Sequence, residues 1–318
     1  DRLGYNNGPR SSVVIDGKFI YTLGVTSILH CLRAVDGKPL WKRDLAAEFK
    51  VRGKFFGQGS TPLIYKDLVI VKIGAEGGPC VTAFNKFNGK LAWGAGNKWG
   101  ASYSSLIVAK LHGRDKILAF AGGESRPPTG GLLCIDPGTG EVDFRFAWRA
   151  DKVESVNAAT PVVLGNRIFL TECYTSGGVM LEVTPEFFVD PVWKAPKFGV
   201  HFMTPVLDKG YLYGFDGRHD LQAELVCYEA KTGKHVYGPD RLPEGRAFTS
   251  SPWAANGKIF YLNEYGVTYV LEAGREFKLL YANKLLEDDM CMATPALAGD
   301  KLIVRTDARV YCFKNGEK

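Results

Sequence analysis

The chain has 318 residues, a length that a single β-barrel or β-propeller domain can reach. Hydrophobic residues make up 46% and charged residues 23%, which excludes a disordered chain, and no apolar run approaches the roughly 18 residues of a membrane-spanning helix. The formal charge of +6 is spread along the chain. The densest basic cluster, Lys50, Arg52 and Lys54, is interpreted as a solvated loop, so nucleic acid is not an expected partner.

Seven short Ser- or Thr-rich steps, each leading into a strand, recur along the sequence. They are RSSVVI from residue 10, STPLIY from 60, SSLIVA from 104, ATPVVL from 159, MTPVLD from 203, SSPWAA from 250 and ATPALA from 293. A polar turn follows each step, and its Gly, Asn and Asp residues tolerate the positive φ of a hairpin. The next segment is rich in β-branched and aromatic residues, as in LVIVKIG and RIFLTE, which predicts a second strand.

A third strand then runs into a glycine turn, and a fourth strand carries an aromatic residue, as in CLRAVDGKPLW, residues 31–41. Four short antiparallel strands in about 45 residues are typical of a propeller blade, so we predict an all-β propeller with seven readable four-stranded repeats in one domain over residues 1–318. The predicted blades are 9–45, 60–96, 102–148, 158–196, 201–240, 249–285 and an incomplete 292–318. The one predicted helical stretch is a turn or two at 44–49.

The aromatic residue at the end of each repeat has a predicted structural role. A blade cannot bury both faces alone, and a flat ring on its outer strand can lie across the glycine turn of the next blade, because glycine has no side chain to block it. The predicted docking residues are Trp41, Trp93, Phe144, Trp193, Tyr237 and Tyr281. Cys31, Cys134 and Cys227 each lie six positions before the turn glycine and are predicted to be buried strand residues.

These repeats resemble those of a known family. Residues 83–93, AFNKFNGKLAW, match the tryptophan docking motif of the quinoprotein propellers, and CIDPGTGEVDF and CYEAKTGKHVY are similar to it. The chain therefore resembles the PQQ-like β-propeller repeat proteins, a group that includes BamB and secreted proteins of planctomycete-type bacteria. The resemblance implies a bacterial protein with a periplasmic or extracellular location, a full-length ring of eight blades, and membership of a membrane-associated complex. It also implies that one blade and the closing strand lie upstream of Asp1, in which case this chain is either an incomplete ring or pairs with a separate fragment that carries the missing N-terminal blade.

No catalytic or metal-binding motif was found in the sequence. HExxH, GxSxG and P-loop patterns do not occur, and GAGNKWG at 94–100 lacks dinucleotide-binding spacing. The five histidines are dispersed, so we predict no metal site, and the acidic run Glu287, Asp288 and Asp289 is interpreted as a solvated corner. The seven cysteines include no CxxC pair.

The preferred interpretation is a non-catalytic module that binds a ligand or protein or assists assembly. One alternative is a PQQ-dependent dehydrogenase, but by family resemblance such an enzyme needs adjacent cysteines, a calcium site and an Asp base, and this sequence has no Cys-Cys pair. PQQ with calcium is therefore disfavoured, and no cofactor is expected. A second alternative is a polysaccharide-active propeller enzyme, whose scattered site residues no linear motif would reveal.

A binding surface is predicted at the mouth of the central channel, where the loops before the inner strands converge. A protein partner, a small ligand or a glycan would bind there. The candidate residues, chosen by their position just before each inner strand, differ from blade to blade: Arg10, Gln58, Tyr103, Asn157, His201 and Arg246.

Overall fold

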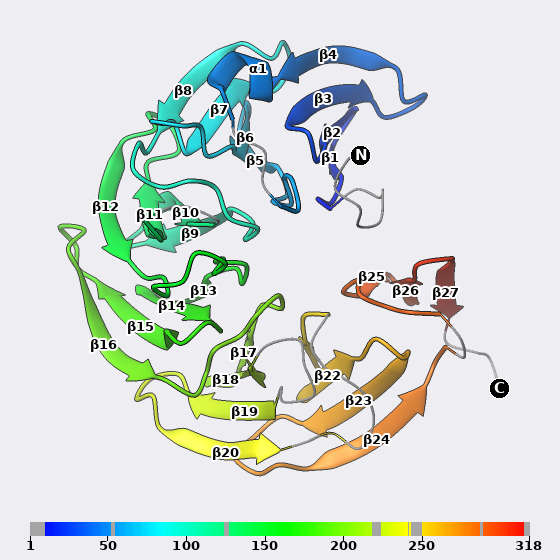
Figure 1. The fold of residues 1–318 in the computed structure, drawn as a ribbon. Helices are drawn as coiled ribbons and strands as arrows, with labels where there is room; N and C mark the ends of the chain where they lie inside the picture. The colour runs from blue at the N-terminus through cyan, green and yellow to red at the C-terminus, as the bar shows by residue number, and fades with distance from the viewer. Residues whose placement is uncertain are drawn as a thin grey trace. The chain divides into compact units, whose positions relative to one another are not determined.

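In the computed structural model, the chain forms an all-β propeller of seven antiparallel sheets, which confirms the predicted fold class (Figure 1). The structure describes residues 10–51, 55–123, 127–217, 224–240, 242, 250–286 and 289–314. Within these residues six sheets have four strands and the last has three. No helix in the described ranges is long and apolar enough to span a membrane.

The first three sheets follow the chain strand by strand. The first contains β1 (Val14–Asp16), β2 (Phe19–Leu23), β3 (Ile28–Arg33) and β4 (Pro39–Asp44), and the helix α1 (Leu45–Phe49) comes next. The second contains β5 (Leu63–Tyr65), β6 (Leu68–Lys72), β7 (Val81–Asn85) and β8 (Leu91–Ala95). The third contains β9 (Ile107–Leu111), β10 (Arg114–Ala121), β11 (Gly131–Ile135) and β12 (Val142–Ala147).

The remaining sheets repeat this order. The fourth contains β13 (Val162–Leu164), β14 (Arg167–Glu172), β15 (Gly177–Val183) and β16 (Val189–Ala195), and the fifth contains β17 (Val206–Asp208), β18 (Tyr211–Asp216), β19 (Glu224–Glu229) and β20 (His235–Asp240). The sixth contains β21 (Trp253–Ala255), β22 (Lys258–Leu262), β23 (Val267–Glu272) and β24 (Leu279–Lys284). The seventh contains β25 (Ala296–Ala298), β26 (Lys301–Arg305) and β27 (Val310–Lys314).

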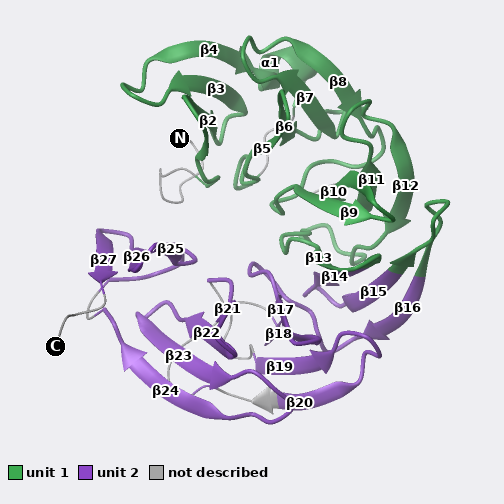
Figure 2. Cartoon of the chain, turned by 180° about the vertical axis from the view of Figure 1, so that it is seen from behind, with its two compact units in different colours: residues 1–167, 182–190 green, residues 168–181, 191–318 purple. Residues whose placement is uncertain are grey.

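The chain divides into two compact units (Figure 2). Unit 1 comprises residues 1–167 and 182–190, and unit 2 comprises residues 168–181 and 191–318. The division passes through the strands of the fourth sheet. The predicted single domain and the predicted eighth blade of a longer ring stay predictions.

The core of each unit lies between adjacent sheets. In unit 1, Ile70 and Val81 of the second sheet belong to one buried cluster with Ile117 and Leu133 of the third. In unit 2, Leu262 of the sixth sheet clusters with Val304 of the seventh. Each sheet therefore buries a face against its neighbour, which a small twisted sheet needs because it cannot bury both faces by itself.

Strand pairing explains why a small residue precedes four of the six docking aromatics; Tyr281 instead lies opposite Val270. The small residue lies directly opposite the aromatic on the neighbouring strand, so its short side chain leaves room for the ring. The aligned pairs are Cys31 with Trp41, Ala83 with Trp93, Cys134 with Phe144, and Cys227 with Tyr237. The prediction that these three cysteines are buried is confirmed.

No disulfide joins any of the seven cysteines, all of which lie in the described residues. Burial raises the pKa of the Cys134 and Cys227 thiols to about 12, so both stay protonated and unreactive near neutral pH. The predicted helical stretch is also confirmed, because α1 begins after Asp44, whose carboxylate accepts a hydrogen bond from the Ala47 amide at 3.0 Å.

Candidate functional site

Tryptophan rings of three outer strands lie on glycine turns of the following sheets. A Cβ on Gly89 would come within 2.9 Å of the Trp41 ring, one on Gly140 within 2.8 Å of Trp93, and one on Gly233 within 2.5 Å of Trp193. Each indole also donates a hydrogen bond to a carbonyl of the same turn: Trp41 to Lys86 O, Trp93 to Pro137 O and Trp193 to Ala230 O. The contact therefore combines ring packing with one satisfied polar group.

The other three docking positions differ in exposure. Phe144 is buried, and Tyr237 packs edge-on against Phe277 at a centroid separation of 5.9 Å. Tyr281 is 59% exposed. The turn that would correspond to the glycine partner of Tyr281, near Gly316, lies outside the described residues.

The Ser/Thr-rich steps connect adjacent sheets. In each case the backbone N–H of one step residue donates to the side-chain hydroxyl at the same position of the next repeat. The bonds are Ser12 N to Thr61 Oγ1 at 3.2 Å, Thr61 N to Ser105 Oγ at 3.2 Å, Thr204 N to Ser251 Oγ at 3.0 Å, and Ser251 N to Thr294 Oγ1 at 2.9 Å. The recurring hydroxyl is thus explained by an inter-sheet hydrogen bond.

Three of the predicted binding residues lie in the interior. Gln58 is 2% exposed and donates to Ile73 O at 3.1 Å; Asn157 is fully buried and donates to Ala121 O at 2.7 Å. His201 is 4% exposed, and its Nε2 lies 3.1 Å from the Tyr174 hydroxyl. This burial differs from the exposed position expected from the sequence, because the amides satisfy backbone carbonyls that would otherwise lack donors.

Arg10 and Tyr103 meet at Phe56. The Arg10 guanidinium donates to Phe56 O and lies 5.8 Å from the centre of its ring. The Tyr103 hydroxyl accepts the Phe56 N–H at 3.2 Å, and the two rings are 5.7 Å apart in an edge-on arrangement. Both side chains are half-buried, and the neighbouring Phe55 is 53% exposed. Arg246 lies outside the described residues.

The described members of the predicted binding set occupy two different positions in the repeat, and these positions face opposite sides. Gln58, Asn157 and His201 lie three residues before the step hydroxyl, whereas Arg10 and Tyr103 lie two residues before it. Successive residues of an extended segment alternate in direction, so only one of these positions can face outward. Aligning the repeats on the hydroxyl would have selected the second position, which in unit 2 holds Phe202, 43% exposed, and Met292, 56% exposed.

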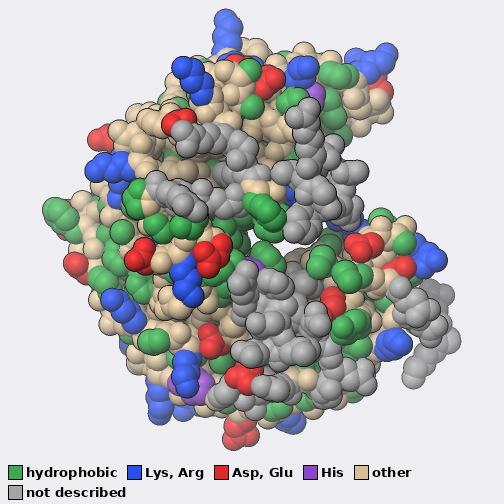
Figure 3. All heavy atoms as spheres, viewed as in Figure 1, with side chains coloured by type: hydrophobic (Ala, Val, Ile, Leu, Met, Phe, Trp, Pro, Cys, Tyr) green, Lys and Arg blue, Asp and Glu red, His purple; other side chains and the backbone are tan. Residues whose placement is uncertain are grey.

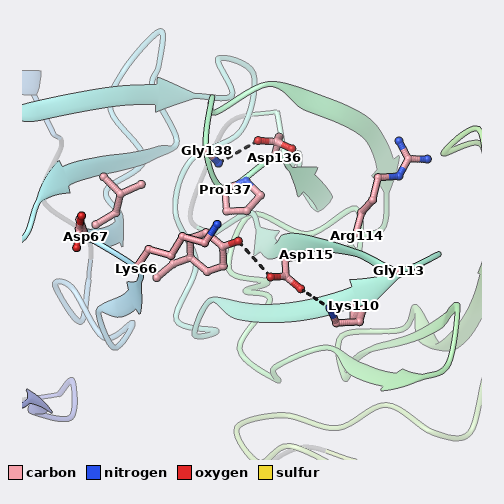
Figure 4. Close-up of a pocket in the computed structure, with 11 residues that line it drawn as sticks. Lys66, Asp67, Lys110, Gly113, Arg114, Asp115, Asp136, Pro137 and Gly138 are labelled. Carbon is pink, nitrogen blue, oxygen red and sulfur yellow. Dashed lines mark hydrogen bonds and ion pairs between the residues drawn. The ribbon is translucent and has the colours of Figure 1, made fainter.

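A groove of about 490 Å³ lies between the second and third sheets in unit 1 (Figure 4). We call it the hairpin groove; it is formed by the β5–β6 turn, the β9–β10 turn and the turn after β11. Its lining includes Tyr65, Lys66, Asp67, Lys110, Asp115 and Pro137. No linear motif in the sequence indicates this groove. On the face drawn in Figure 3, side chains of both charges lie among apolar ones.

Asp115 is held by two hydrogen-bond donors at the edge of this groove. Tyr65 Oη donates to Asp115 Oδ2 at 3.1 Å, and Lys110 Nζ lies 3.3 Å from Asp115 Oδ1. The Lys110 ammonium and then the Tyr65 hydroxyl lower the pKa of the Asp115 carboxyl from its ordinary value. The carboxylate is the acceptor in both contacts, so these donors favour its charged form.

We expect Asp115 to stay ionised at pH values where an ordinary aspartate is already half protonated. Since the folded-state pKa is lowered, the contact stabilises the fold above the ordinary pKa and is lost as the pH falls through the lowered value. Carboxyl ¹³C NMR titration of the folded protein measures this value. Lys110→Met should move the Asp115 pKa upward, and an unchanged titration in that variant would contradict the assignment.

A fully buried lysine lies near the same two sheets. Lys72, at the end of β6, has no exposed surface. Its ammonium donates to Ser102 Oγ at 2.8 Å, to Phe120 O at 2.9 Å and to Ser104 O. Through these acceptors Lys72 links β6 to the loop and strand of the third sheet.

Metal-binding groups are not evident in the part of the chain that the structure describes. Among those residues no three or more His, Cys, Asp or Glu side chains are grouped to hold an ion. Asp289, from the predicted acidic corner, instead accepts hydrogen bonds from Tyr311 Oη at 2.7 Å and from Arg309 Nη1 at 2.9 Å. Glu287 and Asp288 lie outside the described residues.

The repeated four-stranded sheets and their ring-on-glycine contacts define a β-propeller of the quinoprotein-like repeat class. Within that class, the chain belongs to the family described as outer membrane protein assembly factor BamB, whose sequence model matches residues 4–239. This confirms the family resemblance seen in the repeats; the likeness to planctomycete-type members stays a prediction. No curated protein matches the chain.

Several solved structures are similar in fold. BamB from Moraxella catarrhalis superposes with a TM-score of 0.69 at 14% identity, covering 97% of this chain and 84% of that one. A europium-containing methanol dehydrogenase gives 0.67 at 15% identity, over 92% of this chain and 72% of that one. Quinohemoprotein alcohol dehydrogenase from Comamonas testosteroni superposes with a TM-score of 0.65 at 11% identity, covering 93% of this chain and 62% of that one. At these identities the likeness shows the fold alone.

The described residues do not fit a bound pyrroloquinoline quinone. This planar tricarboxylate needs several polar donors facing one cavity, together with ligands for its metal ion. The amide donors of Gln58 and Asn157 and the ammonium of Lys72 are bound to backbone carbonyls in the interior. Grouped metal ligands do not occur in the described ranges either. We therefore derive no reaction through this cofactor, and its disfavoured status stays a prediction.

Proposed function

We propose that the chain is a non-catalytic, extracytoplasmic propeller that binds a protein or small ligand and works as an assembly module. The single observation that carries this proposal is the family match over residues 4–239, because that family is described by an assembly role. The similarity to the Moraxella catarrhalis BamB structure supports the same class. A periplasmic or extracellular location and a membrane-associated complex belong to the proposal by the same resemblance.

The geometry of the loops supports a binding role over a catalytic one. The polar side chains closest to the predicted channel positions bond to the fold's own backbone, whereas exposed apolar groups such as Phe55, Phe202 and Met292 accompany them. Exposed aromatic and methionine side chains are the residue types enriched where proteins bind partners.

The competing function is a PQQ-dependent dehydrogenase, which the similarity to two quinoprotein dehydrogenase structures favours. A polysaccharide-active enzyme is the other alternative. Both are catalytic, so both predict turnover by the purified chain once cofactor and substrate are supplied, which the binding proposal does not.

The proposal predicts no turnover and one stable complex. We expect no dye reduction when the full chain is incubated with PQQ, calcium or europium, and methanol or glucose, and no reducing sugar released from a polysaccharide panel. Chemical cross-linking in envelope fractions of the source cells should give a discrete complex containing an outer-membrane protein. Metal- and quinone-dependent dye reduction would overturn the proposal, as would a chain that cross-links to nothing.

A further inference from the structure

The hairpin groove has an equivalent between the first and second sheets, and there the protein fills it with its own side chains. Lys86 and Phe87 follow β7 and point back onto the β1–β2 hairpin. Lys86 Nζ lies 2.7 Å from Asp16 Oδ2, and the Phe87 ring meets the Phe19 ring edge-on at a centroid separation of 5.6 Å. A cation on an aliphatic stem and a ring together occupy that position.

The two locations correspond residue by residue. Asp16 pairs with Phe19 across the first hairpin as Tyr65 pairs with Leu68 across the second. The turns after β7 and β11 close with the same bond, from Gly89 N to Asn85 O at 2.8 Å and from Gly140 N to Asp136 O at 2.9 Å. Pro137 therefore stands where Lys86 stands one repeat earlier, and Gly138 stands in place of Phe87. The groove is the space that those two side chains would occupy.

Two other sheet pairs also have a basic side chain in the contact between a hairpin and the following sheet. Between the third and fourth sheets, Arg114 Nη2 donates to Pro185 O at 2.6 Å, and its guanidinium lies 4.3 Å from the centre of the Phe187 ring. Between the fifth and sixth sheets, Arg275 Nε donates to Tyr211 Oη at 2.6 Å. Arg114 belongs to the β9–β10 hairpin and reaches out to the turn after β15, whereas Arg275 follows β23 and reaches back to the β17–β18 hairpin. A long basic side chain thus bridges a hairpin and the neighbouring sheet in both cases.

Three carboxylates line the hairpin groove, and two of them, Asp115 and Asp136, are each paired with a described lysine. Lys110 is paired with Asp115, Arg114 is bound to Pro185, and Lys66 Nζ lies 5.2 Å from the Tyr65 ring centre. Asp67 lines the groove, and its carboxylate makes no hydrogen bond or ion pair with any described residue. Leu68 and Pro137 also line the groove and give an aliphatic stem an apolar surface (Figure 4).

We propose that the hairpin groove binds a lysine or arginine side chain of a partner polypeptide, which takes the place of the missing Lys86 equivalent. The stem would lie along Tyr65, Leu68 and Pro137, and the cation would reach the Asp67 carboxylate. This inference rests on the proposed binding function, because it names the surface that contacts the partner and the type of side chain that the partner contributes.

NMR titration of the ¹⁵N-labelled full chain tests the proposal with Nα-acetyl-lysine-N-methylamide, its arginine counterpart and its glutamate counterpart. We expect the two basic probes to shift the amide signals of Lys66, Asp67 and Gly138, while the glutamate probe does not. Asp67→Asn should weaken binding of the basic probes by about two- to fivefold, the range for an exposed ion pair. Asp151→Asn is the matched control, since Asp151 is also exposed and lies outside the groove, and should leave the affinity unchanged.

A variant whose own side chains fill the groove provides the second test. The double variant Pro137→Lys with Gly138→Phe restores the Lys-Phe sequence of the preceding repeat and should abolish the probe-induced shifts. Position 138 can carry a side chain, because a Cβ there would meet nothing closer than Asp136 Oδ1 at 3.4 Å. If the double variant does not fold, the single variant Gly138→Phe is tested for loss of the probe-induced shifts. An unchanged unfolding midpoint would show that this variant is folded.

Three results would overturn the proposal: no shift with either basic probe, equal shifts with the glutamate probe, or shifts that persist in the filled variant. Each of these outcomes leaves the assembly role testable, since that role is judged by turnover and by the cross-linked complex. Quinone-dependent dye reduction, in turn, would refute the assembly role, but it would not change the NMR shifts that report binding in the groove.

Discussion

Trp93→Ala is expected to destabilise the protein by about 3–5 kcal/mol, the usual cost of removing a large buried aromatic side chain. Trp93 is 8% exposed, packs in the cluster between the second and third sheets, and donates to Pro137 O at 3.2 Å. Its removal would open a cavity and leave that carbonyl without its donor. Urea denaturation followed by far-UV circular dichroism measures the loss.

Tyr281→Ala is the matched control, because Tyr281 occupies the same repeat position but is 59% exposed. It should change the free energy of unfolding by no more than about 0.5 kcal/mol, as surface substitutions do. An equal loss in both variants would mean that position in the repeat, and not contact with a glycine turn, sets the cost.

A double-mutant cycle isolates the ring-on-glycine contact. Gly140→Ala places a Cβ 2.8 Å from the Trp93 ring at φ +77°, so it combines a clash with backbone strain. In the Trp93→Ala background the clash disappears and only the strain remains, about 1 kcal/mol. The two substitutions should therefore be less than additive, and strict additivity would show that the residues do not interact.

Lys72→Glu is expected to cost on the order of 3–5 kcal/mol, the cost of leaving a buried charge without its partners. A carboxylate has no N–H to give to Ser104 O or Phe120 O, and it would bring negative charge beside two carbonyl oxygens. The free energy of unfolding from urea denaturation at neutral pH measures the effect. The loss should shrink at low pH, where the introduced carboxyl is protonated.

Lys98→Glu makes the same chemical change at an exposed position and should cost no more than about 0.5 kcal/mol. Lys72→Gln, which keeps two N–H donors, should fall between the two variants. If Lys72→Glu were as stable as Lys98→Glu, the buried ammonium would not contribute the hydrogen bonds described above.

Much of the fold could be predicted because it is encoded locally. Turn residues at DGK and NGK, and β-branched segments such as LVIVKIG, specify hairpins through the backbone preferences of a few neighbouring residues. The spacing from Cys31 to Trp41 also recurs because those two residues pair directly across neighbouring strands. Because the repeats share these patterns, the strands predicted for one sheet could be assigned in the next sheet as well.

The binding residues were harder to predict, for a physical reason that Gln58 and Tyr103 illustrate. Both precede an inner strand and both differ from their counterparts in other repeats, but one residue of offset turns a side chain from the surface to the interior. Gln58 is buried on Ile73 O, while Tyr103 remains half-exposed beside Phe56. Variation between repeats therefore did not by itself indicate exposure.

The sequence by itself determined the strand order, the hairpins, the small residues under the rings and the family. The tertiary structure alone decided the environment of Lys72 and the existence of the hairpin groove. Both depend on residues from separate sheets that meet only after the sheets have packed. Lys72 has acceptors 30 and 48 residues away in the sequence, and the groove exists because Pro137 and Gly138 lack the long side chains of Lys86 and Phe87. Such contacts arise from the packing of distant segments, which local residue preferences do not specify.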